Sequence, residues 1–166
     1  MTKNIYAIFQ DIFPELKQQT LPEDLNEFSI FCDWLNQEHS FIQYVEIKEY
    51  YDNGIDESTI FQQKQVDTEA LNQAIEETVD ELFDSLDEDQ LEDYEARFEI
   101  EEKIEEILFD QIKTFAAQKQ LSLLVVFREN PYWLVVPSQD ESQLQQIADA
   151  FNQHFAQDTN LSMSVY

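Results

Sequence analysis

The chain has 166 residues, of which 36 are acidic and 9 basic, so that its formal net charge is −27. This length predicts a single domain over residues 1–166, and an apolar fraction of 43% with 13 Phe and 7 Tyr is enough to build a buried core. A negative field of this size repels nucleic acid and anionic lipid and attracts basic protein surfaces and cations, so we expect no direct binding of nucleic acid.

The first two elements in chain order are expected to be helices. The first has an apolar stripe at helical spacing, made of Ile5, Ile8, Phe9, Ile12 and Leu16. Pro14 interrupts this stripe, so the helix should kink or end near residue 13. A turn follows at residues 20–22, and Pro22 or Glu23 then opens a second helix. The inward residues of that helix would be Leu25, Phe28, Cys32 and Leu35.

Residues 41–51 are expected to form a strand, because side chains alternate between two faces and many are β-branched or aromatic. The sequence Asp52-Asn53-Gly54 indicates a turn directly afterwards. Residues 55–64 would then continue as the second strand of a hairpin.

The central part of the chain, residues 67–119, is expected to form two long acidic helices, at about 67–86 and 88–119. Apolar residues recur every three or four positions along both segments, and acidic residues occupy most of the remaining positions. Asp67 or Thr68 can cap the start of the first helix.

The break between the two acidic helices is predicted from a change in the apolar stripe. The next position on the stripe is Asp89, whose carboxylate would face the core, so the first helix should end before it. Ser85 with Glu88, and Asp87 with Gln90, each resemble a capping box that would begin a new helix. One bent helix is the alternative.

The C-terminal part predicts a hairpin, a helix and a strand. Two apolar runs, residues 121–127 and 132–136, flank a turn and indicate an antiparallel hairpin. Ser138 or Asp140 would cap a helix with a clear apolar stripe, and residues 161–166 alternate like a half-exposed strand. The complete order predicts an α+β fold, with a mainly antiparallel sheet of four or five strands packed with helices.

Several kinds of catalytic and cofactor site are missing from the sequence. Gly54 is the only glycine, whereas phosphate-binding loops, dinucleotide fingerprints and nucleophile elbows need several. Cys32, His39 and His154 are the only Cys and His residues, and none has the spacing of a zinc ligand with another. We therefore expect no cofactor, no metal centre and no catalytic residues. A metal-dependent hydrolase is the alternative for an enzyme.

The single cysteine, Cys32, rules out an internal disulfide and fits a reducing compartment. Its place on a helical apolar stripe predicts a buried, unreactive thiol. The first residues do not resemble a signal peptide, and no apolar run is long enough to span a bilayer. These features predict a cytoplasmic protein that does not bind membranes.

Two carboxylates of the second acidic helix point toward its apolar side. Glu101 and Glu105 lie one turn apart and roughly in line with Tyr94 and Leu108. In one interpretation Arg97 pairs with Glu101 at a solvated margin. In the other, the two carboxylates form a site for a cation or for a basic side chain.

Aromatic residues near the predicted turns raise the question of an interface. Tyr132, Trp133 and Arg128 cluster at the C-terminal hairpin, and such residues are frequent in interface hot spots. The alternative is that the two aromatic side chains alternate across a covered sheet. Tyr50 and Tyr51 raise the same question beside the turn at Asp52.

The charge distribution favours an acidic protein-binding module that engages a basic partner by charge complementarity. Carboxylates on successive helical turns lie about 5–6 Å apart, which is close to the phosphate spacing along a nucleic-acid strand. An immunity protein that inhibits a basic nuclease toxin, or another nucleic-acid mimic, would have this character. The alternative is a structural or housekeeping protein, such as an assembly subunit, whose charge serves solubility; the sequence does not set its oligomeric state. The candidate partner-binding residues are Glu76, Glu77, Asp80, Glu81, Asp84, Glu88, Glu92, Glu95, Glu99, Glu102 and Glu106.

Overall fold

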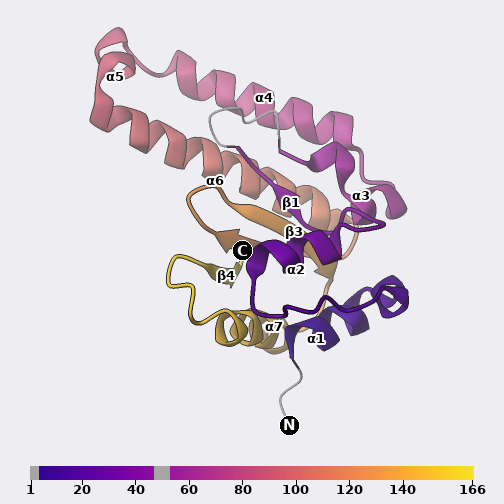
Figure 1. Ribbon diagram of the computed structural model, residues 1–166. Coiled ribbons are helices and arrows are strands. Elements are labelled where there is room, and N and C mark those ends of the chain that lie inside the picture. Colours follow the sequence, from indigo (N-terminus) through magenta and orange to yellow (C-terminus); the bar gives the residue numbers. More distant parts are fainter. Residues whose placement is uncertain (1–3, 47–52) are drawn as a thin grey trace.

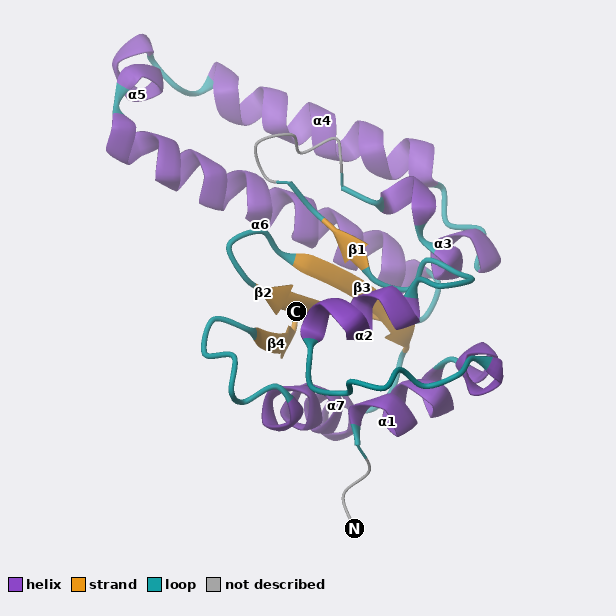
Figure 2. Cartoon of the chain, in the orientation of Figure 1, coloured by secondary structure: helices purple, strands orange, loops and turns teal. Residues whose placement is uncertain are grey.

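The computed structural model describes residues 4–46 and 53–166 (Figure 1). Over these ranges the chain forms the predicted α+β fold, in which a four-stranded antiparallel sheet is covered by helices. The strands lie in the order β1 (Gln43–Tyr44), β3 (Tyr132–Pro137), β2 (Leu121–Phe127) and β4 (Ser162–Val165). Figure 2 shows the long central helices above this sheet and the N-terminal and C-terminal helices below it.

The centre of the sheet is the predicted hairpin of β2 (Leu121–Phe127) and β3 (Tyr132–Pro137), with Leu124 opposite Leu134. The predicted C-terminal strand is β4 (Ser162–Val165), which pairs with β2. Residues 123–126 are all buried. Because neighbouring strand residues point to opposite faces, such continuous burial requires cover on both faces. In the structure α6 (Tyr94–Gln118) packs against β2, and α7 (Glu141–His154) packs against β4.

The N-terminal helices differ in part from the prediction. Helix α1 (Ile5–Ile12) ends before Pro14, as predicted, and a 3-10 helix, η1 (Pro14–Gln18), follows. The prediction that the second helix begins at Pro22 or Glu23 is wrong, because α2 spans Phe28–Leu35. Residues 24–26 form a turn in which the Asp24 side chain accepts the Asn26 N–H, and the Leu25 carbonyl lies 2.6 Å from His154 Nε2. The Asn26 N–H and the Leu25 carbonyl therefore bond outside the helical pattern, and α2 begins after them.

The predicted second strand at residues 55–64 is also wrong, because this segment forms η3 (Ile55–Glu57) and α3 (Thr59–Gln63). Ser58 caps α3 by accepting the Phe61 N–H, a side-chain bond that favours a helix start over a strand. The Thr59 N–H donates to the Ser40 carbonyl at 2.9 Å, and the Thr59 hydroxyl accepts the Ser40 N–H at 2.7 Å. Contacts with the segment before β1 thus hold this helix in place.

The strand predicted at residues 41–51 is represented by β1, which is only Gln43–Tyr44. The Val45 N–H still donates to the Pro131 carbonyl, but proline has no N–H to return, so the ladder with β3 stops there. Residues 47–51 of the predicted strand lie outside the described residues, as do Asp52 of the predicted turn and the candidate interface residues Tyr50 and Tyr51.

Gly54 adopts a left-handed conformation (φ 77°), and an added Cβ would lie 2.7 Å from the Gln43 Cβ.

The central acidic segment forms three helices, α4 (Thr68–Asp84), α5 (Glu88–Glu92) and α6, instead of the two predicted. Asp67 caps α4, and the predicted capping box of Asp87 with Gln90 begins α5. The predicted helix over residues 88–119 is interrupted at Asp93. The Asp93 backbone is extended, and the Asp93 side chain accepts the Glu95 N–H, so that Asp93 caps α6. Helices α4 and α6 then pack along each other (Figure 1).

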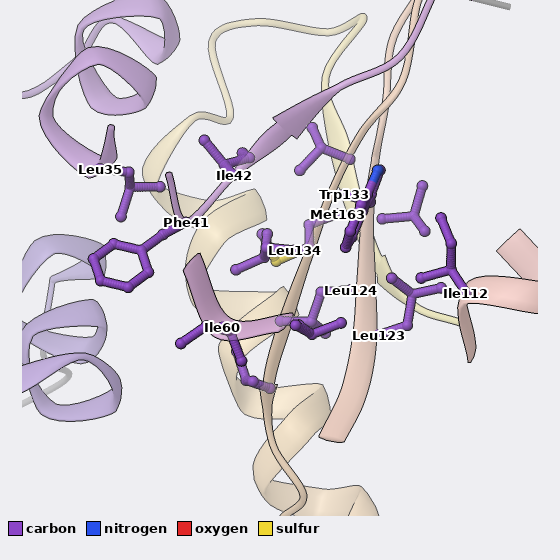
Figure 3. Packing of buried hydrophobic residues seen from close by; sticks show 14 of the residues in the cluster. Leu35, Phe41, Ile42, Ile60, Ile112, Leu123, Leu124, Trp133, Leu134 and Met163 are labelled. Carbon is purple, nitrogen blue, oxygen red and sulfur yellow. The ribbon is translucent and has the colours of Figure 1, made fainter. Parts of the chain in front are cut away.

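The hydrophobic core lies around the β2–β3 hairpin. Trp133 is fully buried in β3; its indole N–H donates to the Asn53 carbonyl at 2.8 Å, and its ring contacts Phe61. The interpretation of Trp133 as an interface residue is therefore wrong, and the covered-sheet alternative is confirmed for it. Tyr132, the next residue, is half-buried. Figure 3 shows the packing of Leu35, Phe41, Ile42, Ile60, Ile112, Leu123, Leu124, Trp133, Leu134 and Met163.

Candidate functional site

The candidate site is the acidic hairpin, which we define as residues 67–119 and which consists of α4, α5 and α6. It contains 19 acidic and 4 basic residues, so more than half of the net charge of the chain lies on about a third of its length. Asp67 and Asp93 cap its two long helices. A carboxylate near a helix N-terminus is stabilised by the helix dipole, so these two acids also support the local fold.

All eleven candidate partner-binding carboxylates are exposed to solvent. The helical period explains this arrangement, because Leu71, Ile75 and Val79 of α4 are buried and the acids occupy the other sides of the helix. The same applies to α6, whose buried side begins at Ile100 and continues to Ala116. Five of the acids lie on α4 (Glu76, Glu77, Asp80, Glu81, Asp84), two on α5 (Glu88, Glu92) and four on α6 (Glu95, Glu99, Glu102, Glu106).

Basic side chains do not neutralise this surface among the residues that the structure describes. Among the described residues, ion pairs join Lys17 to Asp11 and Arg128 to Asp158, and all four residues lie outside the acidic hairpin. The predicted pair of Arg97 with Glu101 is not formed between these two described residues. Arg97 is exposed, whereas Glu101 is half-buried, and holding a long exposed side chain in one position costs conformational entropy. The hairpin therefore presents its negative charge to solvent.

An acidic cleft of about 450 Å³ lies where α6 meets the segment after β1 and the turn between β2 and β3. Glu101 and Glu105 both line it, as expected from their position toward the apolar side of the helix. The residues that line the acidic cleft are Glu46, Phe98, Glu101, Glu102, Glu105, Glu129 and Asn130.

The helical period indicated Glu101 and Glu105 in advance, but nothing in the sequence indicated the other residues that line the acidic cleft. Glu46 and Glu129 are far from α6 in the sequence, and no periodicity relates them to it. The amide of Asn130 donates to the Tyr44 hydroxyl at 2.9 Å, which joins the β2–β3 turn to β1. The nearness of these segments depends on strand pairing, so the sequence carried no local signal for it.

The chemistry of the acidic cleft suits a basic side chain. Its ligands would be carboxylate oxygens, which bind guanidinium and ammonium groups through charge-assisted hydrogen bonds. Within residues 4–46 and 53–166, no three His, Cys, Asp or Glu side chains converge as metal ligands do. An arginine or lysine can reach several carboxylates of a cleft of this size without such convergence.

Burial raises the pKa of the Glu105 carboxyl above its ordinary value of 4.5, and the carboxylates of Glu102 and Glu106 raise it further. The folded state thus holds the proton more tightly than the unfolded state does. Protonated Glu105 stabilises the fold at low pH, and this stabilisation is lost as the pH rises through the folded-state pKa.

Replacing Glu105→Gln is expected to raise the free energy of unfolding near neutral pH by roughly 0.2–0.5 kcal/mol, because the amide removes a like-charge repulsion. The gain should shrink as the pH falls through the folded-state pKa of Glu105, and it should be absent well below 4.5, where the carboxyl is protonated in both states. Urea denaturation across this pH range measures it. Glu99→Gln is the control, because it makes the same change at an exposed position outside the acidic cleft. Equal effects of both substitutions at every pH would contradict the prediction.

Cys32, His39 and His154, the only Cys and His residues of the sequence, lie in surroundings that favour packing over catalysis. Burial raises the pKa of the Cys32 thiol to about 12, and Asp33 contributes, so the thiol stays protonated and is a poor nucleophile near neutral pH. The ring of His154 contacts Tyr6 and Phe155, and its Nε2 bonds to a backbone carbonyl. His39 packs against Phe41. These contacts support packing roles for the three side chains.

The part of the chain that the structure describes has no helix that combines the length and the apolar character needed to cross a bilayer. Comparisons of the chain with protein-family models, with curated proteins and with solved structures found no significant match. A proposal for its function must therefore be argued from the surface of the molecule itself.

Proposed function

We propose that this chain is an acidic protein-binding module that engages a basic partner protein through the acidic hairpin. The observation that carries the proposal is the exposure of all eleven candidate carboxylates, without an ion pair to any of them among the described residues. A surface of this kind attracts a positively charged protein over a distance of about a Debye length and accelerates their encounter.

The same surface supports a more specific role, namely inhibition of a protein that acts on nucleic acid. Carboxylates at one-turn spacing on α4 and α6 lie about 5–6 Å apart and present negative charge at intervals like those of a phosphate backbone. The hairpin would then occupy the basic surface of a nuclease toxin and exclude its substrate. A cytoplasmic location belongs to this proposal, and the single cysteine supports it.

A structural or housekeeping role, for example as an assembly subunit, predicts a different surface. Its mark would be an exposed apolar face away from the acidic residues and a stable homo-oligomer. Four of the seven large apolar side chains that are exposed in the described part of the chain lie within the acidic hairpin, and the other three, Leu21, Tyr44 and Phe127, belong to three different segments. Self-association through the acidic hairpin would place like charges together, so the arrangement favours a basic partner instead.

The test is competition with nucleic acid for a basic nuclease at two salt concentrations. At about 0.01 M salt, where the Debye length is about 30 Å, the chain is expected to bind the nuclease and to displace a labelled oligonucleotide from it. At about 1 M salt the Debye length is about 3 Å, and binding should weaken strongly. Failure to retain any of a panel of basic nucleases at the lower salt would contradict the proposal.

A further inference from the structure

The distal end of the acidic hairpin, residues 80–99, contains no fully buried side chain, although Leu82 and Leu86 are partly buried against the core. The last buried residue of α4 is Val79, and the first of α6 is Ile100. The 25 residues of α6 span about 37 Å, whereas the seven residues of β2 span about 24 Å. Part of the hairpin therefore extends past the sheet that covers its inner side, as Figure 1 shows at α5.

Large apolar side chains are nevertheless concentrated at this distal end. Phe83 is 38% exposed, Leu91 39%, Tyr94 71% and Phe98 54%. We call these four the distal apolar residues. They make up four of the seven large apolar side chains that are exposed in the described part of the chain, although the distal end is only 20 residues long. Scattered exposed apolar residues are normal, but such a concentration on a soluble protein marks an interaction surface.

The distal apolar residues have the arrangement of a binding surface. The rings of Tyr94 and Phe98 lie one turn apart, with centroids 5.2 Å from each other and planes perpendicular, so they form one aromatic unit. Leu91 lies three residues earlier, on the separate helix α5. Phe98 also lines the acidic cleft, next to Glu101 and Glu105. Apolar contact and carboxylates for a cation are therefore adjacent on the same helix.

The charge around these residues decides which kind of partner can cover them. The distal end has one basic residue, Arg97, and ten acidic residues: Asp80, Glu81, Asp84, Asp87, Glu88, Asp89, Glu92, Asp93, Glu95 and Glu99. A second copy of the chain would bring this charge against itself, and anionic lipid or nucleic acid would be repelled. Charge complementarity thus selects a basic protein surface that also presents apolar side chains.

We propose that the distal end binds a basic amphipathic helix of the partner, whose apolar stripe covers Tyr94 and Phe98 and whose arginine or lysine side chain enters the acidic cleft. This inference rests on the proposed function and specifies the partner's surface. A helix is the natural counterpart because its apolar residues form a stripe at three- or four-residue spacing, which can lie along the exposed Tyr94 and Phe98 of α6. Its basic side would face the surrounding carboxylates.

The test uses two fluorescently labelled peptides of about 18 residues, or five helical turns, made only of leucine and lysine. One arranges the leucines as a helical stripe, and the other has the same composition in scrambled order. Fluorescence anisotropy measures the affinity of each peptide for the full chain, for the variant Tyr94→Ser/Phe98→Ser and for the control Leu21→Ser. Leu21 is 44% exposed and lies far from the hairpin in sequence, so its truncation is a matched loss of exposed apolar area.

The unmodified chain and Leu21→Ser are expected to bind the amphipathic peptide about tenfold more tightly than the scrambled one. An affinity difference of about tenfold is the usual effect of one hot-spot contact. Tyr94→Ser/Phe98→Ser should bind both peptides equally, and circular dichroism should show its fold intact because both side chains are exposed. If the unmodified chain binds both peptides equally well, or if the double variant keeps the tenfold ratio, the inference fails and the proposed function stands. If the unmodified chain binds neither peptide at about 0.01 M salt, both fail.

Discussion

Replacing five carboxylates of the acidic hairpin with amides is expected to slow its association with a basic protein by about tenfold at low salt. The change removes five negative charges from an exposed surface where ion pairs do not offset them among the described residues. Stopped-flow association rates at about 0.01 M and about 1 M salt measure it, and the difference from the unmodified chain should vanish at the higher salt. The substitutions are Glu88→Gln, Glu92→Gln, Glu95→Gln, Glu99→Gln and Glu102→Gln.

The control for this experiment makes the same change in net charge away from the hairpin. All five control positions are exposed in the structure. If the hairpin is the binding surface, the control variant should lose much less of the association rate, since nearby charges dominate steering. Equal losses in both variants would show that total charge alone drives association. The control substitutions are Glu15→Gln, Glu23→Gln, Glu27→Gln, Glu38→Gln and Glu141→Gln.

The second large effect is expected for Trp133→Ala, which should lower the free energy of unfolding by about 3–5 kcal/mol. Trp133 is fully buried at the centre of the sheet, so its truncation leaves a cavity among Phe61 and the strand residues around it. It also removes the hydrogen bond from the indole N–H to the Asn53 carbonyl. Urea denaturation followed by circular dichroism measures the loss.

Trp133→Phe separates the two contributions, because it keeps most of the buried ring volume and removes the indole N–H. We expect a smaller loss, of which the hydrogen bond accounts for about 1 kcal/mol. A change of less than about 1 kcal/mol for Trp133→Ala would contradict the placement of this side chain in the core, since fully buried aromatic truncations cost several times more.

The acidic hairpin depends on two different sources of stability along its length. Near the sheet, Leu71, Ile75 and Val79 of α4 are buried together with the inner side of α6, and this burial offsets repulsion among the carboxylates. At the distal end, burial is limited to the partly buried Leu82 and Leu86, and the Asp87 capping box and the Asp93 cap organise the helix ends. The distal end should therefore open more readily than the core in hydrogen exchange.

Helical and strand periodicity predicted much of this protein because both are local properties of the chain. The hairpin of β2 and β3 was predicted correctly. The end of α1 before Pro14 and the cap of α4 at Asp67 each match one of two alternatives that the sequence left open. Exposure of the eleven carboxylates followed from the same period, since a helix that buries one stripe must turn its other residues to solvent. The α+β class then followed from the order of elements.

Other features were decided by contacts between segments that are distant in sequence. Helix α3 begins at its local Ser58 cap, but the hydrogen bonds between Thr59 and Ser40 hold it against a segment 19 residues earlier in the chain. The placement of Glu46 and Glu129 beside Glu101 in one cleft arises from strand pairing. The sequence alone determined which side chains share one side of each helix, because that depends on a repeat of about 3.6 residues. It did not determine how much of that side is covered, since Tyr94 and Phe98 belong to the apolar side of the second acidic helix and are exposed. Only the tertiary structure decided which outward-facing groups become neighbours, because that depends on how separate elements pack.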